Sequence, residues 1–201
     1  MKYKYIKRSL DIIFSCIGLI VLLPLFLIIA AAIKIDSKGP VFFSQKRVGQ
    51  NQKHFHIIKF RTMMQDVPKD VPTHLLDDPS NYVTRVGKIL RKTSLDELPQ
   101  FWNVLKGDMS TIGPRPALWN QKDLIEIREK YNVHSIKPGV TGWAQVNGRD
   151  ELTLKTKVKY DKAYLNNYGF SMDMKVFFLT IVKIFNGEGI KEGKNENTNY
   201  R

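Results

Sequence analysis

The feature that most constrains this chain is an apolar run near its N-terminus, where residues 12–33 contain no charged side chain. Because a helix rises about 1.5 Å per residue, such a run is long enough to cross a hydrocarbon core of roughly 30 Å. Three interpretations compete: a cleaved signal peptide, a straight transmembrane helix, and a helix that enters and leaves on the same side. The run is longer than the apolar part of a usual signal peptide, which disfavours the first interpretation.

The flanks of this run and a proline inside it favour the re-entrant interpretation. Basic residues stand on both sides, and basic flanks tend to stay on the cytoplasmic side of a membrane. Pro24 lies near the middle of the run, where its ring and its missing N–H kink a helix. We therefore predict that residues 1–35 form a kinked, re-entrant membrane helix. The flanking cations are Lys2, Lys4, Lys7, Arg8, Lys34 and Lys38.

The rest of the chain predicts a compact domain over residues 36–186, followed by a polar tail over residues 187–201 that we expect to be disordered. Two apolar stretches on either side of a loop predict a short β-hairpin. The helix at the C-terminal end is either buried in the core or lies on a membrane interface. The fold class is α/β in the broad sense, a helix-rich α+β domain. The predicted strands are 41–43 and 54–60, the helices 85–92, 98–105, 119–131, 152–166 and 173–185, the irregular or extended segments 65–80 and 112–116, and the glycine-rich loop 138–149.

The charge of the chain narrows the choice of partners. Its 32 basic and 19 acidic residues give a net charge of +13, which favours an anionic partner such as nucleic acid, lipid headgroups or a phosphorylated small molecule. Cys16 is the single cysteine, so no disulfide forms within the chain, and no Cys/His cluster has zinc spacing.

Two adjacent acids, Asp96 and Glu97, are the first candidates for chemistry. One interpretation is structural, because Ser94 and Glu97 match the spacing of a helix capping box. Pro99 weakens it, since a proline at the fifth helical position lacks a needed N–H, whereas proline is common at the first. A helix that begins at Pro99 leaves both acids just ahead of it, as a functional pair.

Basic residues and a glycine-rich loop accompany this acid pair along the sequence. Arg115 lies between two prolines, which fix its backbone and suit its guanidinium to bind phosphate. The loop that contains Thr141 and Gly142 offers backbone N–H groups to an anion. Cations around two carboxylates suggest a phosphate site with a divalent metal, because Mg²⁺ binds through one or two carboxylates and substrate phosphates. The other candidate cations are Lys59, Arg61, Arg91 and Arg149.

The motifs PVFFSQKRVG, IIKFRTM, TSLDELPQFWNVLKGDMSTIGPRP and KPGVTGWAQVNGR follow one another in this chain. This order closely resembles the bacterial sugar transferase family, the monotopic phosphoglycosyl transferases, from about residue 7 to about residue 185. The resemblance implies a re-entrant helix broken at a proline and a ping-pong reaction with Mg²⁺. In that reaction Asp96 is the nucleophile that attacks the β-phosphorus of a UDP-sugar and releases UMP. A polyprenol phosphate, such as undecaprenyl phosphate, then takes the phospho-sugar from the aspartate.

The resemblance also implies roles for the other candidates. Glu97 is expected to hold Mg²⁺, with Asp96 as a second ligand, and Arg91 and Arg115 to contact phosphate. It places the chain at the cytoplasmic face of a bacterial inner membrane, among membrane lipids, and leaves self-association and the identity of the sugar open. Lys46 and Lys137 depart from the family pattern, which often has an acid and an arginine at these places. The residues expected at the nucleotide-sugar end are Thr141, Gly142, Gln145, Asn147 and Arg149.

Two rival interpretations stay open at the level of sequence. A basic nucleic-acid-binding protein would carry the same charge, but it does not need the apolar run. A membrane-anchored scaffold without catalysis would keep the run and would release no UMP. The family resemblance favours the enzyme and no nucleic-acid partner.

Overall fold

Helices and two small sheets make up the computed structural model, which describes residues 2–65, 67, 79–148 and 152–186. The helix-rich α+β prediction is confirmed, whereas Arg149 and the segment 187–201 lie outside the described residues. The elements after the N-terminal helices are β1 (Phe42–Val48), η1 (Gln50–Gln52), β2 (His54–Phe60), η3 (Pro79–Tyr82), α3 (Arg85–Thr93), η4 (Leu95–Glu97), α4 (Gln100–Lys106), β3 (Ser110–Ile112), α5 (Lys122–Lys130), η5 (Val133–Ser135), β4 (Gly139–Thr141), α6 (Trp143–Val146), α7 (Leu154–Asn166) and α8 (Phe170–Asn186).

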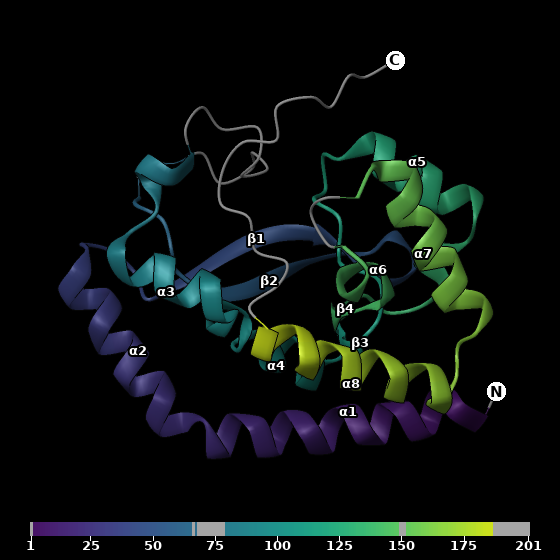
Figure 1. The fold of residues 1–201 in the computed structure, drawn as a ribbon, viewed down its shortest axis with the longest axis horizontal. Coiled ribbons are helices and arrows are strands. Elements are labelled where there is room, and N and C mark those ends of the chain that lie inside the picture. The colour runs from purple at the N-terminus through teal and green to yellow at the C-terminus, as the bar shows by residue number, and fades with distance from the viewer. Residues whose placement is uncertain (1, 66, 68–78, 149–151, 187–201) are drawn as a thin grey trace.

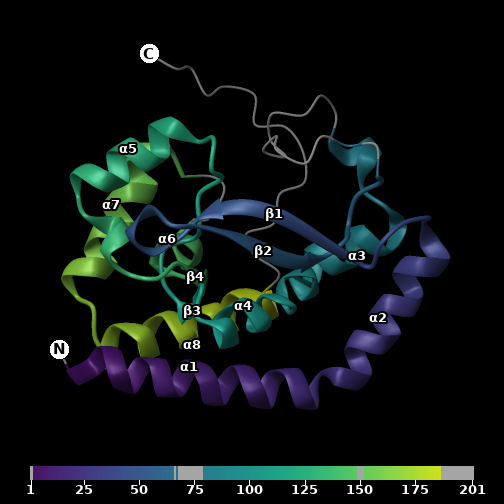
Figure 2. The same cartoon turned by 180° about the vertical axis from the view of Figure 1, so that it is seen from behind.

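The apolar N-terminal run forms two helices, α1 (Lys2–Val21) and α2 (Leu23–Asp36), bent by 60° at the break between them. Pro24 lies in the first turn of α2, where its missing N–H costs little, so the predicted kink is confirmed. Among the helices of the described ranges, none is long and apolar enough to cross a membrane alone, but α1 and α2 together meet that criterion. In both views α4 and α8 lie between α1 and the hairpin, while α2 turns towards α3 (Figures 1 and 2).

The buried residues of α1 are polar, and from Ile12 onward its exposed residues are apolar. Lys7, Asp11 and Ser15 follow one another at intervals of four residues, so they share one side of the helix, and all three are buried. Ile13 and Ile17 are more than half exposed. This is the reverse of the pattern of a helix on a water-soluble protein, whose apolar stripe faces the core.

Polar contacts attach α1 to the domain. Asp11 Oδ1 accepts hydrogen bonds from the Thr111 amide at 2.9 Å and the Thr111 hydroxyl at 2.6 Å. Lys7 forms a buried ion pair with Asp173 of α8, and Asp173 also accepts a hydrogen bond from the Tyr164 hydroxyl at 2.6 Å. These contacts link α1 to β3, α7 and α8.

The predicted β-hairpin is confirmed, and its first strand is longer than expected. β1 and β2 pair antiparallel from Phe42 opposite Phe60 to Val48 opposite His54. Residues 44–47 are polar, so a prediction based on apolar residues did not extend the strand to the end of β1. Phe60 at the end of β2 packs against Ile33 of α2, which ties the hairpin to the N-terminal helices.

The glycine-rich segment is not the loop that the sequence predicted. Residues of β4 pair in parallel with β3, and α6 follows directly. A Cβ on Gly139 would lie 2.1 Å from the amide nitrogen of Gly113, so glycine is required for this close approach. The prediction of a loop was wrong because the strand partner lies far away along the chain and leaves no local signal.

Helix α8 has a buried face, as the core alternative predicts, and a position on a membrane interface stays a prediction. Val176 and Asp173 are buried, and Val176 packs with Ile112 and Tyr164 in one core cluster. Phe178 is 61% exposed on the same helix. One face of α8 therefore belongs to the core, and another face presents apolar side chains outward.

Candidate active site

The acid pair lies on the short turn η4, between α3 and α4. Ser94 adopts a left-handed conformation with φ of 57°, which ends α3 and starts the turn. Ser94 makes no side-chain capping hydrogen bond to η4, so the capping-box interpretation is wrong. Pro99 directly precedes α4, and both acids lie ahead of that helix as predicted. Asp96 and Glu97 are only 8% and 7% exposed, which is unusual for carboxylates and indicates specific partners.

Two cations from other elements approach these carboxylates. Lys59 Nζ of β2 lies 2.7 Å from Glu97 Oε1 and 3.8 Å from Asp96 Oδ2. Arg115 Nη2, from the extended segment after β3, lies 2.8 Å from the same Glu97 Oε1. Burial lowers the pKa of Lys59, and the nearby charge of Glu97 opposes that shift. The fold thus brings Lys59, Asp96, Glu97 and Arg115 together from separate parts of the sequence.

Arg47 is a third cation near this cluster, and no sequence motif predicted it. Burial and the neighbouring charge of Arg115 lower its pKa, and Glu97 opposes the shift. The register of the hairpin places Phe43 opposite Lys59, so Arg47 shares the face of Lys59. If the predicted strand 41–43 had been extended to residue 47, the alternation of side chains between the two faces of the strand would have indicated Arg47 as a candidate.

The remaining predicted cations have other partners in the fold. Arg61 is buried, and its guanidinium donates to the carbonyl oxygens of Ser37 and Lys38, so it holds the turn that follows α2. Arg91 Nε donates to Thr62 Oγ1 at 2.9 Å. Contact of Arg61 and Arg91 with a substrate phosphate stays a prediction.

Among the predicted nucleotide-sugar residues that the structure describes, Thr141 lies on β4 and Gln145 on α6, while Gly142 directly precedes α6 and Asn147 directly follows it. Thr141 Oγ1 lies 2.8 Å from Thr180 Oγ1 of α8. Gln145 Nε2 donates to the Val140 carbonyl, and Asn147 Nδ2 donates to the Trp143 carbonyl. These hydrogen bonds shape the backbone of the segment, and a role in binding the nucleotide stays a prediction.

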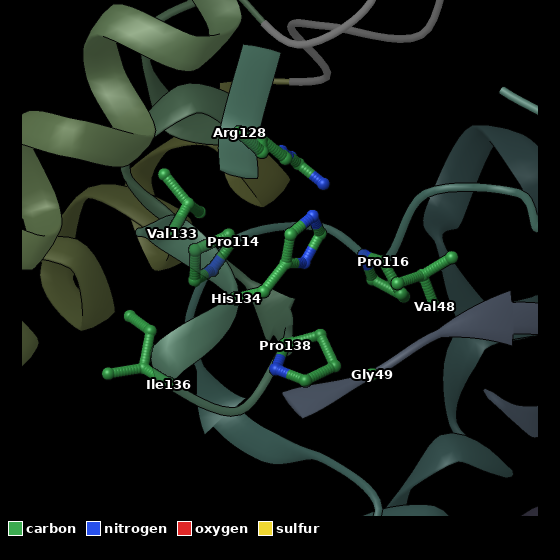
Figure 3. A pocket seen from close by; sticks show the side chains of 9 residues that line it. All are labelled: Val48, Gly49, Pro114, Pro116, Arg128, Val133, His134, Ile136 and Pro138. Carbon is green, nitrogen blue, oxygen red and sulfur yellow. The ribbon is translucent and has the colours of Figure 1, made fainter. Parts of the chain in front are cut away.

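Two cavities are lined by residues from other parts of the fold, and neither is lined by Asp96 or Glu97. One is about 10 Å³, room for about one water molecule, and His134 points into it between Pro114 and Pro116 (Figure 3). The other is an open groove of about 310 Å³ beside Trp119, between the end of the hairpin and α5.

The donor set of the acid pair suits a hard divalent cation. In the part of the chain that the structure describes, no group of three or more His, Cys, Asp and Glu side chains is placed to hold a metal. Mg²⁺ does not need such a group, because it keeps several waters and binds through one or two carboxylates plus substrate phosphates. Asp96 and Glu97 supply two carboxylates of this kind, so the residues present fit the metal.

Comparisons with known proteins agree with the motifs. A family model described as bacterial sugar transferase matches residues 2–187. The chain is 40% identical over 94% of its length to the UDP-N-acetylgalactosamine-undecaprenyl-phosphate N-acetylgalactosaminephosphotransferase of Aeromonas hydrophila, and it covers 46% of that protein. It is 41% identical over 90% of its length to the UDP-glucose:undecaprenyl-phosphate glucose-1-phosphate transferase of Escherichia coli, covering 40% of that protein.

Other relatives match the chain over most of their own length. The sugar transferase EpsL of Bacillus subtilis is 40% identical over 93% of the chain, which covers 91% of EpsL. The chain therefore spans less than half of some relatives and nearly all of others. With the family model matching almost the whole chain, the protein belongs to the bacterial sugar transferase family.

Proposed function

We propose that this protein transfers a sugar phosphate from a UDP-sugar to a polyprenol phosphate, with Asp96 as the nucleophile. The observation that carries the proposal is the buried acid pair with Lys59 and Arg115 directed at it from two other elements. The names of relatives in Aeromonas hydrophila and Escherichia coli support the substrate classes, a UDP-sugar and undecaprenyl phosphate.

The contacts in the site support different roles for the two acids. Glu97 Oε1 is shared by Lys59 and Arg115, so Glu97 fixes the two cations beside Asp96. Lys59 Nζ is closer to Glu97 than to Asp96, at 2.7 Å against 3.8 Å. A carboxylate can act as the nucleophile of a two-step displacement, and because Glu97 contacts both cations, we give the attack to Asp96.

The reaction takes place in two displacements. An Asp96 oxygen forms a bond to the β-phosphorus of the UDP-sugar, and the bond from that phosphorus to UMP breaks. A phosphate oxygen of the polyprenol phosphate then attacks the same phosphorus, and the aspartate leaves as a carboxylate. Lys59 and Arg115 offset the charge on the phosphoryl oxygens during both steps. Asp96 and Glu97 would hold Mg²⁺, which when bound adds to this charge compensation.

The surface of the N-terminal helices supports a membrane location for the acceptor. From Ile12 onward the exposed residues of α1 are apolar, and α2 carries exposed Leu27 and Ile28. Contiguous exposed apolar surface of this kind suits contact with lipid rather than water. A bent pair that enters and leaves on the cytoplasmic side places the acid pair on the side where nucleotide-sugars are made.

The test is UMP release from a panel of UDP-sugars, with polyprenol phosphate and Mg²⁺, by protein in lipid nanodiscs. We expect the wild type to release UMP from at least one sugar, and Asp96→Asn to lower the rate at least about a thousandfold, because the nucleophile is lost. Asp123→Asn is the matched control, since Asp123 is an exposed acid in the first turn of α5.

A second measurement tests the covalent step directly. With a UDP-sugar labelled at the β-phosphate and no acceptor, label is expected on wild-type and Asp123→Asn protein but not on Asp96→Asn. Equal UMP release by Asp96→Asn would remove Asp96 as nucleophile. A folded wild type that releases no UMP from any sugar would favour the non-catalytic scaffold.

A further inference from the structure

The extended segment that carries Arg115 is held through its carbonyl oxygens by three different parts of the fold. The Pro114 carbonyl accepts a hydrogen bond from the Gly139 amide at 2.9 Å. The Arg115 carbonyl accepts from Arg128 Nη1 at 2.8 Å, and the Pro116 carbonyl accepts from Arg47 Nη1 at 3.0 Å. Because prolines lack an N–H, the segment cannot be fixed by its own amides at two of these three residues. Its position therefore depends on these external donors.

Arg128 is the most firmly fixed of these donors. It lies on α5 and is 4% exposed, and its Nε and Nη2 donate to Asp161 Oδ2 of α7 at 2.9 and 2.7 Å. Asp161 is 1% exposed. A planar guanidinium held by two donors on one edge directs its remaining nitrogen along a fixed line, and here that line ends on the Arg115 carbonyl.

The contacts then continue to the acid pair. Arg115 presents its carbonyl to Arg128 and its guanidinium to Glu97 Oε1, at 2.8 Å in both cases. A chain of direct contacts thus runs from Asp161 through Arg128 and Arg115 to Glu97.

Little free volume exists beside the two prolines that flank Arg115. Arg128 and His134 extend into the space between Pro114 and Pro116, and the cavity left there is about 10 Å³ (Figure 3). His134 Nε2 is buried and has no hydrogen-bond partner within the described ranges, and Arg128 makes a side-chain contact to the Arg115 carbonyl. Removing that contact leaves the Arg115 carbonyl without its buried donor.

We propose that the buried Arg128–Asp161 pair is a positioning unit that sets the place of Arg115 beside the acid pair. The inference rests on the proposed function for the role of Arg115 in catalysis, but the position of the segment can be measured without it. Neither Arg128 nor Asp161 touches the reacting groups in this proposal.

Arg128→Lys is the first variant, because lysine keeps the charge but one ammonium cannot span Asp161 and the Arg115 carbonyl in the same geometry. We expect kcat for UMP release to fall roughly 10- to 100-fold with a smaller change in KM for the UDP-sugar, since a small misplacement of a catalytic group acts mainly on turnover. In an Arg115→Ala background the same change is expected to alter kcat less than about twofold, because the group being positioned is absent.

Hydrogen exchange supplies a measurement that needs no activity. Arg128→Lys and Asp161→Asn are both expected to speed amide exchange in the peptide that covers residues 110–118 and to leave residues 100–107 unchanged. Lys162→Gln is the matched control: Lys162 is the next residue of α7, it is exposed, and its ammonium lies over the Tyr131 ring. It should leave exchange in both peptides at the wild-type rate.

The outcomes separate the two proposals. Faster exchange at 110–118 in a protein that releases no UMP would support the positioning role and remove the proposed function. Normal exchange, or an equal loss of kcat with and without Arg115, would overturn the positioning role while leaving the proposed function intact. Should Arg128→Lys unfold, Asp161→Asn takes its place, and unfolding of both would assign the pair to general stability and overturn the inference.

Discussion

His134 lines the small cavity beside Arg128. We therefore expect its protonation to affect the stability of the fold next to the active site. Burial is the main cause that lowers the pKa of His134, and the adjacent Arg128 cation adds to it, against smaller opposing effects from the Ile125 backbone and Glu129. This lowered pKa favours the neutral form of His134 in the folded protein. Protonation would place a second positive charge next to the guanidinium that holds Arg115.

This arrangement predicts that native stability falls as the pH drops below about 6.5, the ordinary pKa of histidine. Because the native pKa is lower than that of the unfolded chain, the unfolded chain binds more protons in this range, and protonation favours unfolding. The measurement is the melting temperature at about pH 7.5 and about pH 5.5, where histidine charge changes.

His134→Gln provides the comparison, since glutamine does not titrate. We expect this variant to show a smaller loss of melting temperature between the two pH values than the wild type. His54→Gln is the control, because His54 is exposed on β2. An identical loss in the wild type and His134→Gln would contradict the prediction.

At the scale of elements, the parallel pair β3 and β4 fixes the segment that carries Arg115. The Gly113 amide donates to the Thr141 carbonyl at 2.8 Å, and a Cβ on Gly142 would lie 2.0 Å from the Gly113 carbonyl oxygen. The two strands therefore meet through glycine backbones, with no room for a methyl group at this point.

Gly142→Ala is expected to lower the free energy of unfolding by about 1–3 kcal/mol, the usual cost of overpacking, and to lower UMP release by displacing the Arg115 segment. Urea unfolding in detergent gives the first quantity and the nanodisc assay gives the second. Gly169→Ala is the control, because the nearest atom to a Cβ at Gly169 is 3.8 Å away. Equal stability of the two variants would contradict the prediction, because it would mean that the segment accommodates the added methyl group at no cost.

The elements that could be predicted from sequence are those with local signals. The proline kink, the hairpin and the helices at α3, α4, α5, α7 and α8 follow from apolar spacing, prolines and glycines close to each element. The place of the acid pair just ahead of a helix could also be predicted from nearby residues, because Pro99 indicates where α4 begins. Lys59 and Arg115 were found through their motifs.

What could not be predicted depends on partners far apart in the sequence. Neither the pairing of β3 with β4 nor the Arg128–Asp161 ion pair leaves a signal in the neighbouring sequence. Arg128 lies in a helix of mixed charge, where an arginine is normally solvated. The contact between Asp11 and Thr111 likewise joins residues far apart in the sequence.

At the scale of the whole molecule, the bend between α1 and α2 is the feature from which we predict the re-entrant topology that the proposed function requires. Lys4 and Lys38 are exposed and lie at opposite ends of the bent pair. A re-entrant pair keeps both on the cytoplasmic side, whereas a straight span would separate them.

Cysteine labelling tests this topology. In a Cys16→Ala background, Lys4→Cys and Lys38→Cys are each expected to react with a membrane-impermeant maleimide in inverted inner-membrane vesicles and not in intact spheroplasts. A cysteine at Asn120, in the domain itself, marks the cytoplasmic side as the control. Labelling of residue 4 from the outside would establish a spanning helix.

The buried ion pair between Lys7 and Asp173 also constrains when α1 can dock on the domain during synthesis. The two residues are 166 positions apart, so α1 has left the ribosome long before Asp173 is synthesised. A lysine is costly to bury without its counter-ion. Helix α1 is therefore synthesised early, but it can form this contact with the domain only after α8 has been translated.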